Sequence, residues 1–112
     1  MPLINVRISS SKVVNPNELL KELSSELANS TGKPENYVMC LLQTDVPMTF
    51  GGSDEPCCYV EIKSIGALRP SKMTESFCNL IQSKTEIPSN RIYIGFEDVE
   101  ASNWGFNGQT FG

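Results

Sequence analysis

The sequence predicts an α/β (α+β) domain, in which two β-α-β units form a four-stranded mixed sheet with two helices on one face. Two observations lead to this prediction. Short segments with alternating apolar residues, which is typical of strands, are interleaved with two longer segments whose apolar residues recur at helical spacing. The order strand–helix–strand occurs twice, over residues 2–45 and 57–98 of a single 112-residue domain. Parallel strands joined by a helix cross over right-handedly, so each unit places its helix on the same side.

The first unit opens with a strand over residues 2–8. Its apolar residues on one face are Ile4, Val6 and Ile8. A helix follows, because Asn15 can cap it, Pro16 suits its first position and Glu18 stands three residues after the cap. Its apolar stripe consists of Leu19, Leu20, Leu23 and Leu27. Gly32 is a natural end for this helix, and residues 37–43 predict a second, well-buried strand.

The second unit follows a turn-rich stretch over residues 45–56. Residues 57–65 alternate again and predict the third strand. Pro70 can open the second helix, and Pro88 follows its end. The stripe of that helix consists of Met73, Phe77, Leu80 and Ile81. The inner face of the fourth strand consists of Ile92, Ile94 and Phe96.

Composition narrows the classes of function. The formal net charge is −4, which disfavours nucleic acid and anionic membranes as partners. No apolar run approaches membrane-spanning length, and the first ten residues do not resemble a secretory signal, so we expect a cytoplasmic protein. The four cysteines have no metal-binding spacing and histidine is absent, so we expect free thiols and no metal site. The cysteines are Cys40, Cys57, Cys58 and Cys78.

The sheet face away from the helices predicts an oligomer. That face carries a mixture of apolar and polar residues, among them Asn5, Arg7, Glu61 and Lys63. A mixed face with apolar members is either solvated or covered by another subunit, and we expect the second arrangement.

Pro2 is the candidate catalytic group that the residues themselves suggest. Removal of Met1 would leave a secondary amine at the head of a strand. A neutral amine is a good base, and this chain has no histidine to serve as one. Most proteins that begin with Met-Pro make no use of the proline, so the dipeptide alone is a weak signal.

Six segments strengthen this interpretation, because together they resemble a known family. They are MPLI at 1–4, TGKPENY at 31–37, MTFGGSDEPC at 48–57, SIG at 64–66, NRIYI at 90–94 and NWGFNGQTF at 103–111. In this order and spacing the chain resembles the family of macrophage migration inhibitory factor and D-dopachrome tautomerase, in the tautomerase superfamily. The resemblance implies a homotrimer whose sheets form a central barrel, with short extra strands in residues 101–112 that reach neighbouring subunits.

The resemblance also implies a cofactor-free keto–enol tautomerase. Its substrates would be small aromatic keto acids such as phenylpyruvate and hydroxyphenylpyruvate, or dopachrome. Pro2 would be the base, Lys33 would hold the substrate carboxylate or carbonyl oxygen, and the Ile65 N–H would donate to the substrate in a site lined by Ser64. Tyr93 would reach the pocket from a neighbouring subunit. An aromatic pocket would be completed by Tyr37, Trp104, Phe106 and Phe111.

The chain departs from the family pattern at several positions. Gly95 stands where mammalian members have an asparagine that hydrogen-bonds the substrate, and Trp104 and Phe106 stand where valine and tryptophan are usual. Substrate preference is therefore open. Cys57 keeps the first position of a mammalian C-x-x-C pair, but Val60 occupies the second, which predicts that thiol–disulfide exchange is lost.

Two other classes of function stay open. The family includes secreted, cytokine-like proteins that bind cell-surface receptors and leave cells without a signal peptide, and plant and microbial members described as light-inducible. A protein that acts by binding a receptor would use its surface, and its pocket would have no catalytic role. Hydration or dehalogenation, which other members of the superfamily perform, would need arginines and an acid near the proline. Arg7 is a poor substitute for these groups.

Overall fold

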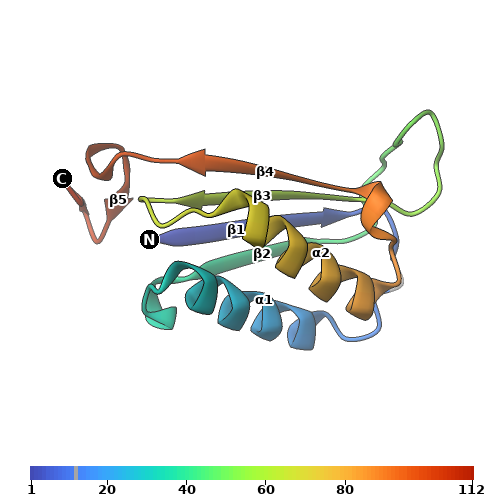
Figure 1. Ribbon diagram of the computed structural model, residues 1–112, viewed down its shortest axis with the longest axis horizontal. Helices are drawn as coiled ribbons and strands as arrows, with labels where there is room; N and C mark the ends of the chain where they lie inside the picture. Colours follow the sequence, from blue (N-terminus) through green and yellow to red (C-terminus); the bar gives the residue numbers. More distant parts are fainter. Residues whose placement is uncertain (12) are drawn as a thin grey trace.

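The computed structural model describes residues 1–11 and 13–112, and it has the predicted order of elements. In chain order these are β1 (Pro2–Ile8), α1 (Pro16–Thr31), η1 (Glu35–Tyr37), β2 (Met39–Gln43), β3 (Cys58–Ser64), α2 (Pro70–Thr85), η2 (Ser89–Arg91), β4 (Ile92–Asp98), η3 (Ala101–Asn103), β5 (Gly105–Phe106) and β6 (Gln109–Thr110). The two helices lie on one face of the sheet (Figure 1). This confirms the predicted fold class.

The four long strands form one mixed sheet in the order β2-β1-β3-β4. The pairs β1–β2 and β3–β4 are parallel, as expected for two β-α-β units, and the central pair β1–β3 is antiparallel. In that central pair Pro2 lies opposite Ser64, and Ile8 lies opposite Cys58. The amino terminus therefore lies at the end of the sheet where β3 finishes. The carboxy-terminal hairpin lies at that same end, and the loop between β2 and β3 extends from the opposite end (Figure 1).

The hydrophobic core lies between the sheet and the two helices. The strands contribute their alternate residues, and α1 and α2 contribute one stripe each. The core residues from the helices include Leu19, Leu23, Leu27, Met73, Phe77 and Ile81. Leu20 and Leu80, which the spacing places on these stripes, are only half-buried, and of the two Leu80 packs against the core. The ammonium of Lys84 joins the two helices on the outside through Glu18 (3.2 Å) and Glu22 (2.9 Å).

The ends of α1 follow the predicted signals. The Asn15 side chain accepts a hydrogen bond from the Glu18 backbone N–H (3.3 Å) and donates one to the Glu18 carboxylate (3.0 Å). This reciprocal arrangement satisfies a backbone donor that the helix itself leaves unpaired. At the other end Gly32 adopts a left-handed φ of 69°, which stops the helix directly before Lys33.

The prediction of a well-buried second strand over residues 37–43 is wrong in extent and in burial. The strand begins later, at Met39, because Glu35–Tyr37 form a 3₁₀ turn after Pro34. It is also an edge strand of the sheet: it pairs with β1 on one side, and none of the described strands lies on its other side. Its burial accordingly alternates between exposed and half-buried residues, with Met39 and Leu41 exposed.

The four cysteines are free, as predicted, and Cys57, Cys58 and Cys78 are buried. Within residues 1–11 and 13–112, neither α1 nor α2 combines the length and the apolar character that a bilayer-crossing helix needs.

We predict that Asn15→Ala lowers the free energy of unfolding by about 1 kcal/mol, because the cap of α1 is lost. Asn17→Ala, at an exposed position in the first turn with no capping bond, should change it by less than about 0.5 kcal/mol. Urea unfolding of both variants at the same protein concentration measures the difference. Equal stabilities would contradict the capping role.

Candidate active site

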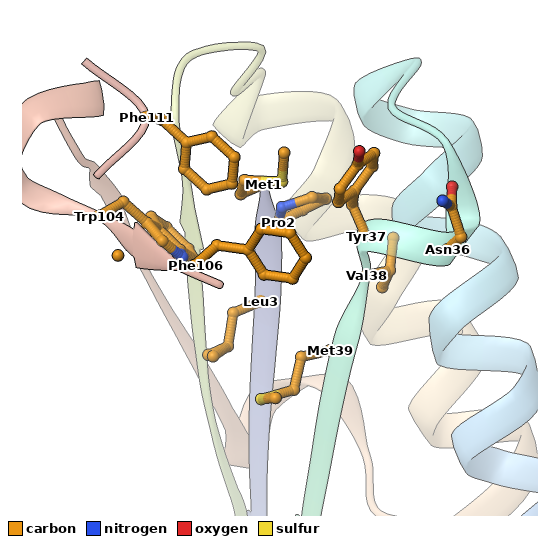
Figure 2. Close-up of a pocket in the computed structure, with 11 residues that line it drawn as sticks. Met1, Pro2, Leu3, Asn36, Tyr37, Val38, Met39, Trp104, Phe106 and Phe111 are labelled. Atoms are coloured by element: carbon orange, nitrogen blue, oxygen red, sulfur yellow. The ribbon is translucent and has the colours of Figure 1, made fainter. Parts of the chain in front are cut away.

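A cavity of about 240 Å³ opens at the amino-terminal end of β1. Four separate segments of the chain line it: the amino terminus, the junction of η1 and β2, the region of β5, and the last residues (Figure 2). The lining residues are Met1, Pro2, Leu3, Asn36, Tyr37, Val38, Met39, Trp104, Gly105, Phe106 and Phe111. The structure thus brings the predicted Pro2, Tyr37, Trp104, Phe106 and Phe111 together in one place.

Pro2 is the buried centre of this group. It is the first residue of β1, a strand position where a residue without an N–H removes no ladder hydrogen bond. Its ring lies between Tyr37 on one side and the aromatic residues of the carboxy-terminal segment on the other (Figure 2). Met1 also lines the cavity, beside Phe111 in the same view. Removal of Met1 would therefore widen the cavity and leave the Pro2 amine inside it.

The aromatic side chains of the cavity pack on one another. Phe106 stacks on Phe111 with ring centroids 5.7 Å apart and an interplanar angle of 7°, and it meets Tyr37 edge-on at 5.8 Å. The backbone N–H of Phe111 donates to the carbonyl of Trp104 (3.1 Å), which folds the last residues back over β5. The cavity is thus bounded by flat apolar surfaces, which suit a flat apolar ligand.

Lys33 does not line the cavity, but its charge acts on the amino terminus. Burial is the larger cause that lowers the pKa of the Met1 amine, and the positive charge of Lys33 lowers this pKa further. Both effects disfavour the ammonium form. The Lys33 backbone N–H is held by the Thr31 hydroxyl (3.3 Å), directly after the left-handed turn at Gly32. The charge of Lys33 therefore acts on an amine at this end of β1, as the predicted pairing requires.

Ser64 and Ile65 lie beside this site without lining the cavity. Ser64 is fully buried opposite Pro2, and its hydroxyl oxygen has no hydrogen-bond partner among the described residues. Its carbonyl accepts from the Val99 N–H (2.9 Å), which ties the end of β3 to β4. Ile65, the next residue, is half-buried where the strand ends. A polar atom thus stands unpaired close to the proposed base.

Tyr93, another predicted site residue, lies far from Pro2 within the same chain. It pairs with Tyr59 near the start of β4, whereas Pro2 pairs with Ser64 at the other end of β3. Its side chain is 66% exposed on the face without helices. It lines a second cavity of about 280 Å³ together with Met48, Thr49, Phe50, Gly51, Cys57, Cys58 and Tyr59. These two cavities lie at opposite ends of the sheet.

Several residues of the first cavity are not predicted from the sequence, three of them close to one predicted residue. These three are Asn36, Val38 and Met39, which flank Tyr37 at the junction of η1 and β2. Pro34 is a signal for a turn before the strand, whereas the pattern of residues 37–43 alone predicts a continuous strand. Gly95, where the chain departs from the family pattern, is exposed. A Cβ atom built there would lie 3.7 Å from the Tyr59 hydroxyl oxygen, an ordinary van der Waals distance.

We predict that Lys33→Met raises the pKa of the amino-terminal amine, because the neighbouring positive charge is removed while the burial remains. Part of the lowering should therefore persist. An NMR titration of the amine without substrate measures the change. Lys21→Met, an exposed lysine near the start of α1, should leave this pKa unchanged. An unchanged pKa in Lys33→Met would contradict the electrostatic role.

Comparisons with known proteins agree with this arrangement. The family model for macrophage migration inhibitory factor (MIF) matches residues 1–112. The macrophage migration inhibitory factor of Xenopus laevis is 35% identical over 114 residues, covering 99% of each chain, and the homolog of Brugia malayi is 43% identical over 96 residues, covering 83% of this chain and 84% of its own. The crystal structure of the homologue from Prochlorococcus marinus has a TM-score of 0.93 at 57% identity, covering 98% of this chain and 99% of that one. The chain belongs to the macrophage migration inhibitory factor family.

Proposed function

We propose that this protein is a cofactor-free keto–enol tautomerase of small aromatic keto acids, with Pro2 as its base after removal of Met1. The observation that carries the proposal is the environment of the amino terminus. Pro2 is buried at the head of β1 against an aromatic cavity, and both burial and Lys33 favour the neutral form of an amine at this place. Membership of the family supports a tautomerase-like function in general.

A neutral amine at this position meets the requirements of a general base. An α-amino group ordinarily has a pKa of about 7.7–8.0, and a prolyl amine is somewhat more basic. It must lose its proton to act near neutral pH, and the same burial and the same positive charge that lower the pKa of the Met1 amine would act on Pro2. A base with a pKa near the working pH gives the best compromise between availability and strength.

The proposed reaction moves one proton within the substrate. The Pro2 nitrogen takes a proton from the carbon next to the keto group, and the electron pair of that C–H bond moves toward the carbonyl oxygen. The enolate that forms is stabilised by donors and by positive charge, the roles proposed for the Ile65 N–H and Lys33. The protonated amine then gives its proton to the enolate oxygen, which yields the enol and restores the base. Atoms and charge balance without a cofactor.

The complete site is proposed to form between subunits of a homotrimer. A cavity of about 240 Å³ is smaller than the roughly 300–1,000 Å³ of typical ligand pockets, which fits a site that a second chain completes. The face without helices exposes Met39, Leu41 and Tyr93, apolar surface that another subunit would cover. In such a ring Tyr93 of one subunit would face the Pro2 cavity of the next.

The departures from the family pattern bear on the substrate. Because Gly95 has no side chain, no side-chain hydrogen bond can come from that position to a substrate group. Trp104 and Phe106 enlarge the aromatic wall of the cavity. A flat, apolar substrate such as phenylpyruvate, held by ring contacts and by its carboxylate, fits this environment better than one that needs several polar contacts.

We predict that Pro2→Gly lowers kcat/KM for phenylpyruvate tautomerisation by about 10²–10⁴-fold, the usual contribution of a general base. The expected cause is a primary amine with different basicity and a freer backbone. An ultraviolet assay of keto–enol conversion measures the rate, and the mass of the purified parent protein should correspond to a chain without Met1.

The matched control is Pro16→Gly, a proline at the start of α1 with no contact to the cavity, which should keep full activity. Full activity in Pro2→Gly would refute the proposed base. An inactive parent protein that still binds a protein partner after pocket substitutions would instead favour the interaction role.

The thiols support no second activity. Cys57 and Cys58 are both 1% exposed, and burial among neighbouring thiols raises the pKa of Cys58 to about 12. A thiol with so high a pKa has almost no thiolate near pH 7, and the position of a resolving cysteine is taken by buried Val60. We predict that the protein reduces insulin no faster than its Cys57→Ser variant does. Turnover clearly above that variant would contradict the prediction.

A further inference from the structure

Arg91 stands out among the residues outside the Pro2 cavity. It is the last residue of η2, directly before β4, and two residues before Tyr93. It is half-buried, and its side chain reaches back to the loop between β2 and β3, 35 to 41 residues earlier in the chain. Nothing in the proposed chemistry uses this residue.

The guanidinium of Arg91 donates to four main-chain carbonyls of that loop. Its Nε donates to Pro56 (3.0 Å), its Nη1 to Phe50 (3.2 Å), and its Nη2 to both Ser53 (3.3 Å) and Glu55 (2.9 Å). Among the described residues it forms no ion pair with a carboxylate. All three nitrogens of the side chain are thus committed to the backbone of one short segment.

The segment that Arg91 holds is a tight turn. Phe50 and Ser53 exchange two backbone hydrogen bonds of 3.0 and 3.1 Å across Gly51 and Gly52. These two glycines have φ values of +61° and +77°, a conformation that other residues rarely adopt. The carbonyls of Phe50 and Ser53 therefore accept from the turn and from the guanidinium at the same time. Arg91 thus connects this hydrogen-bonded turn to the start of β4.

The side chains continue this connection to Tyr93. The guanidinium carbon of Arg91 lies 5.2 Å from the centre of the Phe50 ring, within the range of a cation–π contact. The Phe50 ring in turn packs on the Tyr93 ring, with centroids 4.7 Å apart and an interplanar angle of 51°. The Tyr93 side chain is otherwise largely exposed. Phe50 is thus the ring against which Tyr93 rests.

We propose that Arg91 is a positioning residue, which sets the orientation of the Tyr93 ring through the Phe50 turn. The proposal rests on the proposed function in one respect: it assigns to this ring a place in the site that Tyr93 shares with the Pro2 cavity of a neighbouring subunit. Arg91 itself touches neither the cavity nor the substrate. It fixes the position of the Tyr93 ring, which in the proposed oligomer lines the Pro2 cavity of the next subunit.

A lysine cannot replace Arg91 in this role. Its ammonium keeps the charge, but it has three donors on one nitrogen and lacks the planar fork that reaches four carbonyls. It also stacks less well on an aromatic ring. Arg91→Lys should therefore loosen the turn and the Phe50 ring while preserving the net charge.

The test is a double-mutant cycle on the purified protein with phenylpyruvate as substrate. Arg91→Lys should lower kcat/KM by about tenfold, mainly through KM, because the substrate wall is misplaced and the base is intact. In a Tyr93→Ala background the same substitution should change kcat/KM by less than about twofold. A tenfold loss in both backgrounds would overturn the proposal. Arg69→Lys is the matched control, because Arg69 donates to a single carbonyl, that of Ser30 (2.6 Å), and should show no loss.

A second measurement does not depend on catalysis. The chain has three tyrosines, so 3-fluorotyrosine labelling gives three ¹⁹F resonances, which tyrosine-to-phenylalanine variants assign. Arg91→Lys should shift or broaden the Tyr93 resonance and leave that of Tyr37 unchanged. An unchanged Tyr93 resonance overturns the positioning role, whether or not Pro2→Gly shows that the tautomerase proposal is correct. Should Arg91→Lys fail to fold, Phe50→Leu removes the same ring contact and should give the same two results.

Discussion

The antiparallel pairing of β1 with β3 is the constraint on which the site depends. It places Pro2 opposite Ser64, so the first strand begins where the third one ends. It also puts β1 in the interior of the sheet, with a strand on each side and helices over one face. The burial that disfavours a charged amine at the amino terminus follows from this position. Slipping the register by one residue would turn Pro2 to the face without helices and expose it.

Local signals in the sequence predicted most of the fold. Alternation located β1, β3 and β4, and the residues around Asn15 and Gly32 located the ends of α1, because these signals act over a few neighbouring residues. The exposure of β2 could not be predicted in this way, since it depends on which strand lies at the edge. The aromatic residues of the cavity were named from the family resemblance. The contacts of Arg91 span 35 to 41 residues and leave no local pattern.

The two ends of the sheet have different physical requirements. In the proposed function the end with Pro2 has to keep water from an amine, and rings from η1, β5 and the carboxy terminus line the cavity there. The end with Tyr93 must hold a largely exposed ring, and it does so with a turn whose carbonyls are tied to Arg91. Paired strands connect the two ends rigidly. Between them the face without helices carries both charged and apolar groups, such as Glu61 beside the Tyr59 hydroxyl (3.2 Å).

The net charge of the chain and the local environment of its amino terminus shift the pKa of the terminal amine in opposite directions. A net charge of −4 favours protonation of an amine, yet the pKa of the amine at this site is lowered. The local effects prevail because exposed charges are screened beyond about 8–10 Å at physiological salt, whereas burial and Lys33 act at short range. A carboxylate side chain in the cavity lining would oppose these effects by pairing with the ammonium, whereas the carboxylate of the proposed substrate would pair with Lys33. In the proposed function the apolar lining therefore has two roles: it binds a flat substrate, and it keeps the amine of Pro2 uncharged.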